Sequence, residues 1–469
     1  MLRRLFGEGS LSIAFIPVFT EYFTNKGKDE AFKMARSAIR LLSVFLVVTV
    51  IAGVLLSPVI IRLIAPGFVA SPEKYSLTVL LTRIMFPYIF FIGLVALCMG
   101  ILNVLGHFAA PALAPVFLNI SIIGSVLLIA PHMADPVTGI AIGVLIGGFL
   151  QLALQVPFLI KKGFYFWKKA NIYHPGLKKV GLLMLPTVFG AAVYQINILV
   201  GTLLASLLVQ GSVSYLYYAD RLVQFPLGIF AIATATAVLP SLSRQAAEKD
   251  LQAVRDTFSY AMRMVFFITI PSMVGLIVLR EPIIELLFKR GAFDSETTRL
   301  TAYALLYYSI GLWAFSAVRI VVSTFYALQD TRTPVRTAIV SVCANIILGV
   351  ILMGPMGHGG LALSTSLASM LNLGLLVRVL RKKLGALGLK GIIESACKTM
   401  ICSGIMGAVV WATAFLIIPS EDGTLSGLFF GLMGSIVTGL VLYGSFSLLL
   451  KSKELKNVLA IAGKGIDKK

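Results

Sequence analysis

Five ionisable residues stand where the sequence is otherwise apolar. Arg3, Arg4 and Glu8 open the first apolar segment, Arg40 lies in the second, and Arg263 lies in a segment beyond the midpoint of the chain. A charge at the centre of a bilayer costs at least about 2.5 kcal/mol, so such a residue usually faces a cavity or a partner. Guanidinium groups hold phosphates and diphosphates through paired hydrogen bonds. The arginines therefore predict a cavity that binds an anion of this class.

A second interpretation of Arg40 and Arg263 needs no ligand. Neither is far from the expected cytoplasmic end of its segment, and a long arginine side chain can reach the lipid headgroups from there. We favour the cavity for Arg263 and the headgroups for Arg40. The neighbouring Asp220 and Arg221 can neutralise each other, which would be a structural role. Acids are rare in the apolar segments, and this argues against a cavity for cations.

The sequence shows no signature of an enzyme. Its four histidines lack metal-binding spacing, its four cysteines lack CxxC spacing, and no glycine-rich loop ends in GK[ST]. We therefore expect a transporter without a cofactor or a bound metal. Its coupling would come from an ion of unknown identity or from the membrane potential.

The composition indicates a membrane protein. Hydrophobic residues make up 58% of the 469 positions and charged residues only 13%, against about 25% charged in a typical soluble domain. Apolar segments of about 20 residues, each long enough to cross a bilayer as a helix, recur to the end of the chain. We predict an all-α polytopic fold with about thirteen spans. These are residues 5–23, 36–65, 76–104, 111–131, 137–160, 180–208, 212–241, 257–280, 298–327, 334–353, 359–380, 396–418 and 425–449.

The net charge of +20 gathers in alternate loops. Basic loops follow the first, fifth, seventh, ninth and eleventh spans, and residues 451–469 form a basic tail. Because positively charged loops stay in the cytoplasm, we expect the tail there. The charge is then explained by topology, and we expect no nucleic-acid partner.

An internal repeat relates the two parts of the chain. Arg40 matches Arg263, Asn119 matches Asn345, and other matched segments share an offset of 221 to 226 residues. A repeat of constant orientation is typical of transporters whose halves are related by an axis along the membrane normal. We therefore expect two pseudo-symmetric helical bundles, an N-terminal lobe (1–170) and a C-terminal lobe (171–390).

Two additional helices (391–450) and the basic tail (451–469) would follow the bundles. The second copy of the repeat has an extra leading helix, residues 180–208. We expect its counterpart, a transmembrane helix within about 40 residues, to precede Met1. Prolines such as Pro87 and Pro226 predict kinks, and buried amides such as Gln151 more often join helices than bind ligands.

Several motifs resemble those of the MurJ/MviN family of lipid II flippases. The most specific is SVSYLYYADRL at residues 212–222, and FYALQDTRTPV at 325–335 is nearly as good. LRRLFGEG at 2–9, APGF at 65–68 and APVFLNIS at 114–121 are also similar. The matches run in order along essentially the whole chain.

This resemblance implies a fourteen-helix fold of the MOP exporter superfamily, in the bacterial cytoplasmic membrane. It implies that lipid II is carried from the inner to the outer leaflet by alternating access, for cell-wall synthesis. Arg3, Arg4 and Arg263 would hold the diphosphate, with Glu8 and Arg40 beside them, and residues 396–449 would form a groove for the lipid tail. We expect a monomer whose partners are lipid II and the bilayer.

Other classes fit the sequence less well. A drug–cation antiporter should carry an acidic cluster in a span of the first half, and none follows Glu8. A lipid-linked glycosyltransferase should gather Asp, Glu or His at one membrane face. A structural scaffold has no need of arginines at matched depths. A polysaccharide flippase also handles a diphosphate, and only the motifs argue against it.

Overall fold

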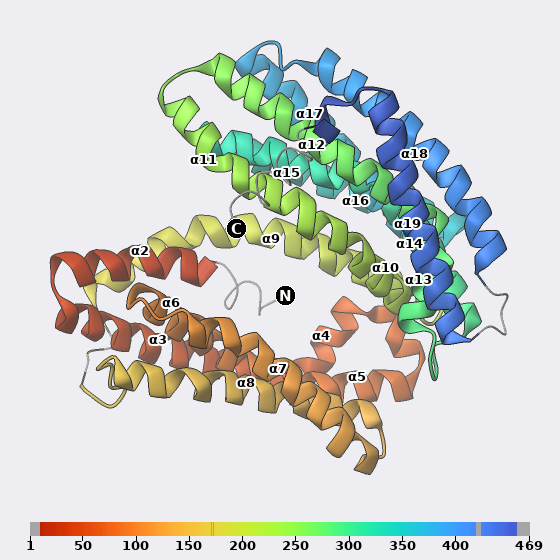
Figure 1. Cartoon of the computed structure of the whole chain (residues 1–469). Helices are drawn as coiled ribbons and strands as arrows, with labels where there is room; N and C mark the ends of the chain where they lie inside the picture. The colour runs from red at the N-terminus through yellow and green to blue at the C-terminus, as the bar shows by residue number, and fades with distance from the viewer. Residues whose placement is uncertain (1–9, 170, 172, 419–423, 457–469) are drawn as a thin grey trace. The chain divides into compact units, whose positions relative to one another are not determined.

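The computed structural model describes residues 10–169, 171, 173–418 and 424–456, and these residues are almost entirely helical (Figure 1). They form two compact units, divided between Leu203 and Leu204. The first unit contains α2 (Ser10–Asn25), α3 (Lys28–Leu55), α4 (Ser57–Ile64), η1 (Pro66–Ala70), α5 (Pro72–Met85), α6 (Tyr88–Val104), α7 (Ala109–Leu128), η2 (Ala130–His132), α8 (Pro136–Lys161) and most of α9 (Pro175–Ser206).

The second unit begins within α9 and runs to the end of the chain. Its helices are α10 (Ser212–Pro226), the π-helical turn η3 (Leu227–Ile232), α11 (Ala233–Ala247), α12 (Leu251–Val278), α13 (Arg280–Phe288), α14 (Ser295–Ile310), α15 (Leu312–Ala327), α16 (Arg332–Met356), α17 (His358–Leu384), α18 (Leu389–Ile417) and α19 (Leu425–Leu449).

Among the described residues, ten helices are long and apolar enough to cross a membrane. The count is eleven if α14 and α15, which meet at a 43° bend, form one span. Each of these spans coincides with a predicted one. The two remaining predictions fall on α2, with 16 described residues, and on α9, in which Gln195–Ser206 forms a shorter apolar segment. The polytopic all-α fold is therefore confirmed.

The order of the helices repeats as the sequence predicts. In each unit a 28-residue helix, α3 or α12, is followed directly by a short one, α4 or α13. A broken pair comes next, α5–α6 or α14–α15, and then an antiparallel hairpin, α7–α8 or α16–α17. The helices α18 and α19 come after the second copy and have no counterpart in the first.

Small residues allow the hairpin helices to approach closely, which is how membrane helices pack when lipid removes the hydrophobic driving force. A Cβ on Gly139 of α8 would lie 2.6 Å from the Cα of Ala130. At the matched position, Gly360 of α17, a Cβ would overlap the carbonyl group of Leu352. Both contacts are with backbone, so neither can be relieved by turning a side chain.

Basic loops meet at one end of the second unit. Lys383, in the last turn of α17, pairs with Asp330, which precedes α16. Gly385 approaches the guanidinium of Arg255 near the start of α12. The segment after α19 also reaches this end, as described below. Three loops that the charge pattern assigns to the same side of the membrane therefore do lie together.

Two of the prolines coincide with breaks in the helices. Pro87 lies in the break between α5 and α6, and Pro226 directly precedes η3. Pro115 and Pro271 lie inside α7 and α12 without ending them. Prolines in the sequence therefore mark positions at which a helix can break, but they do not predict which of those positions are broken.

Candidate anion site

The five predicted site residues are not all described. Arg3, Arg4 and Glu8 lie outside the described residues. Arg40 belongs to the first unit and Arg263 to the second, so each is considered in its own surroundings.

Arg263 is positioned by α12. The helix begins after Asp250, whose carboxylate accepts a hydrogen bond from the backbone N–H of Ala253 at 2.9 Å. Arg263 lies about 18 Å along the helix from its start, and its side chain is 28% exposed. Its Nε donates to the backbone oxygen of Ser259 at 3.3 Å. The Nη atoms donate to no described residue, so the outer edge of the guanidinium is available to an anion.

A carboxylate from the other end of the unit faces this arginine. Glu454 follows α19 and is 92% buried, and its Oε1 lies 3.9 Å from Nε of Arg263. Ser395 donates to Oε1 at 3.0 Å and Ser452 donates to Oε2 at 2.9 Å. Burial raises the pKa of Glu454. The backbone N–H of Glu454, the hydroxyls of Ser452 and Ser395, and the charge of Arg263 together outweigh burial, so the pKa is lowered overall.

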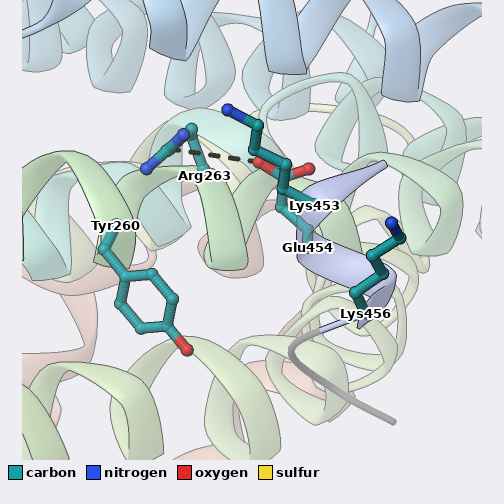
Figure 2. Close-up of a pocket in the computed structure, with 5 residues that line it drawn as sticks. All are labelled: Tyr260, Arg263, Lys453, Glu454 and Lys456. Carbon is teal, nitrogen blue, oxygen red and sulfur yellow. Dashed lines mark ion pairs between the residues drawn. The ribbon is translucent and has the colours of Figure 1, made fainter. Parts of the chain in front are cut away.

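The two residues line a cavity of about 270 Å³. Figure 2 shows the guanidinium of Arg263 beside the carboxylate of Glu454, and Lys453 and Lys456 on the same helical turn as Glu454. Tyr260, one turn before Arg263 on α12, completes the lining. Three cations and one carboxylate leave a net charge of two positive units, so the cavity suits an anion with more than one negative charge.

Helices α18 and α19 hold the cavity together. Both pack against α12, where Cys402, Met406 and Val410 of α18 belong to the same buried cluster as Phe267 of α12. Figure 1 shows α18 and α19 as the last two long helices of the chain. The segment Lys453–Lys456 follows α19, and this packing carries it to Arg263.

Arg40, the repeat mate of Arg263, contacts backbone. Its Nη2 donates to the carbonyl of Lys168 at 2.9 Å, in the loop between α8 and α9. Ser37, on the same helix, donates to the carbonyl of Asn171 in that loop. Arg36, one turn earlier, is only 7% exposed. In the first unit, the matched arginine therefore anchors a loop.

Other predicted polar residues join helices or their own neighbours. Gln151 of α8 donates to the carbonyl of Ala114 in α7 at 3.1 Å, as expected of a buried amide. Arg221 donates to the hydroxyl of Tyr217 at 3.1 Å, and Asp220 accepts from Gln224. No group of His, Cys, Asp and Glu that could hold a metal occurs among the described residues.

Sequence reasoning missed the part played by the tail. Lys453, Glu454 and Lys456 were grouped with the cytoplasmic basic residues, although they supply most of the cavity's lining. One signal was present: Glu454 is the only acid between Lys451 and Lys464. A single carboxylate within such a basic segment indicates a specific cationic partner.

Comparison with solved structures first defines the fold. An inward-facing multidrug resistance MATE family transporter of the MOP superfamily matches with a TM-score of 0.70 at 17% identity, over 82% of this chain and 88% of the other. At that identity the likeness concerns the fold alone. It agrees with the predicted MOP-type fold, two bundles of helices with the order found here.

The family follows from three further matches. The structure of lipid II flippase MurJ in an inward closed conformation matches with a TM-score of 0.79 and 30% identity, over 96% of this chain and 90% of that one. A probable lipid II flippase MurJ of Vibrio cholerae is 39% identical over 425 residues, which cover 87% of this chain and 80% of the relative. The lipid II flippase MurJ of Burkholderia cenocepacia is 35% identical over 387 residues, 82% of this chain and 75% of the relative.

The family model described as lipid II flippase MurJ matches residues 1–420. The chain therefore belongs to the MurJ family of lipid II flippases. The matched region includes Arg40 and Arg263 and ends after α18, whereas α19 and Glu454 lie beyond it.

Proposed function

We propose that this chain is a transporter that carries lipid II across the cytoplasmic membrane, from the inner to the outer leaflet, by alternating access. The observation that carries the proposal is the family match over residues 1–420, supported by relatives named as lipid II flippases over most of their length. Such a protein works in cell-wall synthesis and carries out no covalent chemistry.

The cavity beside Arg263 fits the chemistry of this substrate. Lipid II joins a polar sugar–peptide head to a long lipid through a diphosphate, which carries two negative charges. The free edge of the Arg263 guanidinium and the net positive cavity are suited to that group. We propose that Arg263 contacts the diphosphate. Arg3, Arg4 and Glu8 remain predicted substrate contacts, whereas Arg40 is assigned to the loop between α8 and α9.

The lipid tail requires an apolar surface, and α18 and α19 present one. Trp411, Phe415 and Leu416 of α18 and Phe430 and Leu440 of α19 are each at least 64% exposed. In a bilayer these side chains meet acyl chains without cost. We propose that this pair of helices, residues 389–449, accompanies the tail while the head crosses.

Orientation and energy supply follow from charge. We propose that the end of the second unit where basic loops meet lies in the cytoplasm, together with the tail after α19, because positively charged loops are retained there. Outward movement of an anion is favoured by a potential that is negative inside, by about 2.3 kcal/mol per charge per 100 mV. We propose the membrane potential as the driving force, without a cofactor, in a protein that acts as a monomer.

The test is transport of lipid II by purified protein in proteoliposomes, with binding measured in detergent. Arg263→Ala should weaken binding of lipid II by roughly 10- to 150-fold, because a hydrogen bond to a charged group is worth about 1.5–3 kcal/mol. Arg263→Lys keeps the charge but not the paired donors and should be intermediate.

Arg244→Ala is the matched control, since it removes an exposed cation from the last turn of α11 that is not among the residues lining the cavity of Arg263. It should bind as the unmodified protein does. If neither the unmodified protein nor any variant transported lipid II, the proposed function would be refuted. Normal binding by Arg263→Ala would refute the role of this residue alone.

A further inference from the structure

The helical turn after α19 brings a carboxylate to the arginine that the proposed function assigns to the diphosphate. Glu454 is held there by Ser395 of α18 and by Ser452, both within 3.0 Å. It is therefore fixed from two sides, and among the described residues it is the only carboxylate that lines the cavity of Arg263, Lys453 and Lys456. An acid in this place is unexpected if the cavity serves only to attract anions.

The distance between Arg263 and Glu454 indicates a weak ion pair. A charge-assisted hydrogen bond between a guanidinium and a carboxylate usually measures 2.7–2.9 Å, whereas Nε of Arg263 and Oε1 of Glu454 are 3.9 Å apart. Glu454 thus neutralises Arg263 across a gap and leaves the Nη atoms to another acceptor. A diphosphate carries twice the charge of a carboxylate and can engage two guanidinium donors at once.

We infer that Glu454 is an internal counter-ion of Arg263, which the diphosphate of the substrate displaces. This inference rests on the proposed function and deepens it, because it assigns a second residue to the same site. Glu454 is a positioning residue: it does not touch the substrate, but it sets the charge that an arriving anion meets. Its displacement would leave Arg263, Lys453 and Lys456 facing the diphosphate without a competing acid.

The experiment is a cycle of two substitutions in the full chain, with binding of lipid II measured in detergent. Glu454→Gln keeps an acceptor for Ser395 and Ser452 but removes the charge. It should tighten binding at least fivefold, because each unit of like charge about 4 Å away costs about 1 kcal/mol in water. In the Arg263→Ala background, the same substitution should change binding by less than twofold.

Two controls separate charge from structure. Glu454→Asp keeps the charge and should bind within twofold of the unmodified protein. Glu394→Gln removes an exposed carboxylate from α18, where it pairs with Lys398 at 2.9 Å, and should leave binding unchanged. If Glu454→Gln does not fold, Ser395→Ala loosens the carboxylate and should tighten binding in the same direction, by a smaller factor.

The outcomes distinguish this inference from the proposed function. Unchanged or weaker binding by a folded Glu454→Gln, with Arg263→Ala still impaired, overturns the counter-ion and leaves the function standing. Equal tightening with and without Arg263 overturns it as well, because Glu454 would then act on the cavity as a whole. Absence of lipid II binding in every variant and in the unmodified protein is a failure of the proposed function.

Discussion

The hydroxyl of Tyr443 in α19 donates a 2.6 Å hydrogen bond to the backbone oxygen of Phe267 in α12, 176 residues earlier in the chain. The two rings also lie 5.1 Å apart, between their centroids. This contact fixes the last helix to the helix that carries Arg263. It joins α19, which follows the second copy of the repeat, to α12, which belongs to that copy.

Removal of this hydroxyl should loosen the last helix. Tyr443→Phe leaves a buried carbonyl without its side-chain donor, so we expect a loss of about 0.5–1.5 kcal/mol of stability. Thermal unfolding in detergent would measure it. Tyr173→Phe, at a hydroxyl on a residue that is 88% exposed, is the control and should have no effect.

The glycines at matched positions in the two hairpins should be equally intolerant of alanine. Gly139→Ala and Gly360→Ala force a Cβ into neighbouring backbone, and we expect each to cost about 1–3 kcal/mol. The same change at Gly124 or Gly374, where a Cβ meets open space, should be neutral. Thermal unfolding of the four variants decides the matter, and equal stability of all four would contradict the packing.

The pair between Lys383 and Asp330 should make stability depend on acid pH. Burial raises the pKa of Asp330, but Lys383 and the side chain and amide of Thr333 outweigh it and hold the pKa well below the ordinary value. The pair's contribution is therefore complete above the unfolded pKa of about 3.9 and is lost as the pH falls through the folded pKa.

The corresponding variant is Asp330→Asn, compared with the unmodified protein by thermal unfolding between pH 3 and 8. The difference between them should be constant from pH 8 to about pH 5 and shrink below about pH 4. Asp135→Asn, at an exposed acid without a side-chain capping bond, should follow the unmodified protein. A difference that grows toward acid pH would reverse the assigned sign.

Arg40 should behave as a loop anchor. Arg40→Ala removes the hydrogen bond to the carbonyl of Lys168. We expect trypsin to cleave after Lys168 and Lys169 about fivefold faster, which corresponds to about 1 kcal/mol. Arg83→Ala, at an exposed arginine of α5, should not change the rate. Unaltered cleavage together with weaker lipid II binding would instead place Arg40 in the substrate path.

The sequence predicted the fold well because the signals are local. Long apolar segments give the spans, and alternate basic loops give the end at which Lys383 and Asp330 meet. The repeat gives the order of helices, because each copy must form the same bundle. Helix boundaries were less accurate: α3 begins at Lys28 and α12 at Leu251, several residues before the predicted spans, because polar turns extend a helix beyond the membrane.

The site could be predicted only in part, because its partners come from distant segments. Arg40 and Arg263 match in sequence, yet Arg40 bonds to a loop carbonyl and Arg263 faces a carboxylate. The difference arises because α18 and α19, which have no counterpart in the first copy, bring Glu454 to α12. A repeat predicts equivalent positions, but the surroundings of a position depend on what packs there.

The π-helical turn η3 has a mechanical consequence for the long helical stretch from Ser212 to Ala247. A π turn contains one residue more than an α turn. If the π turn became an α turn, α11 would rotate by about 100° around the helix axis relative to α10, because one residue of an α-helix corresponds to that angle. Loss of the π turn would therefore turn residues 233–247 relative to residues 212–226 while both segments stay helical.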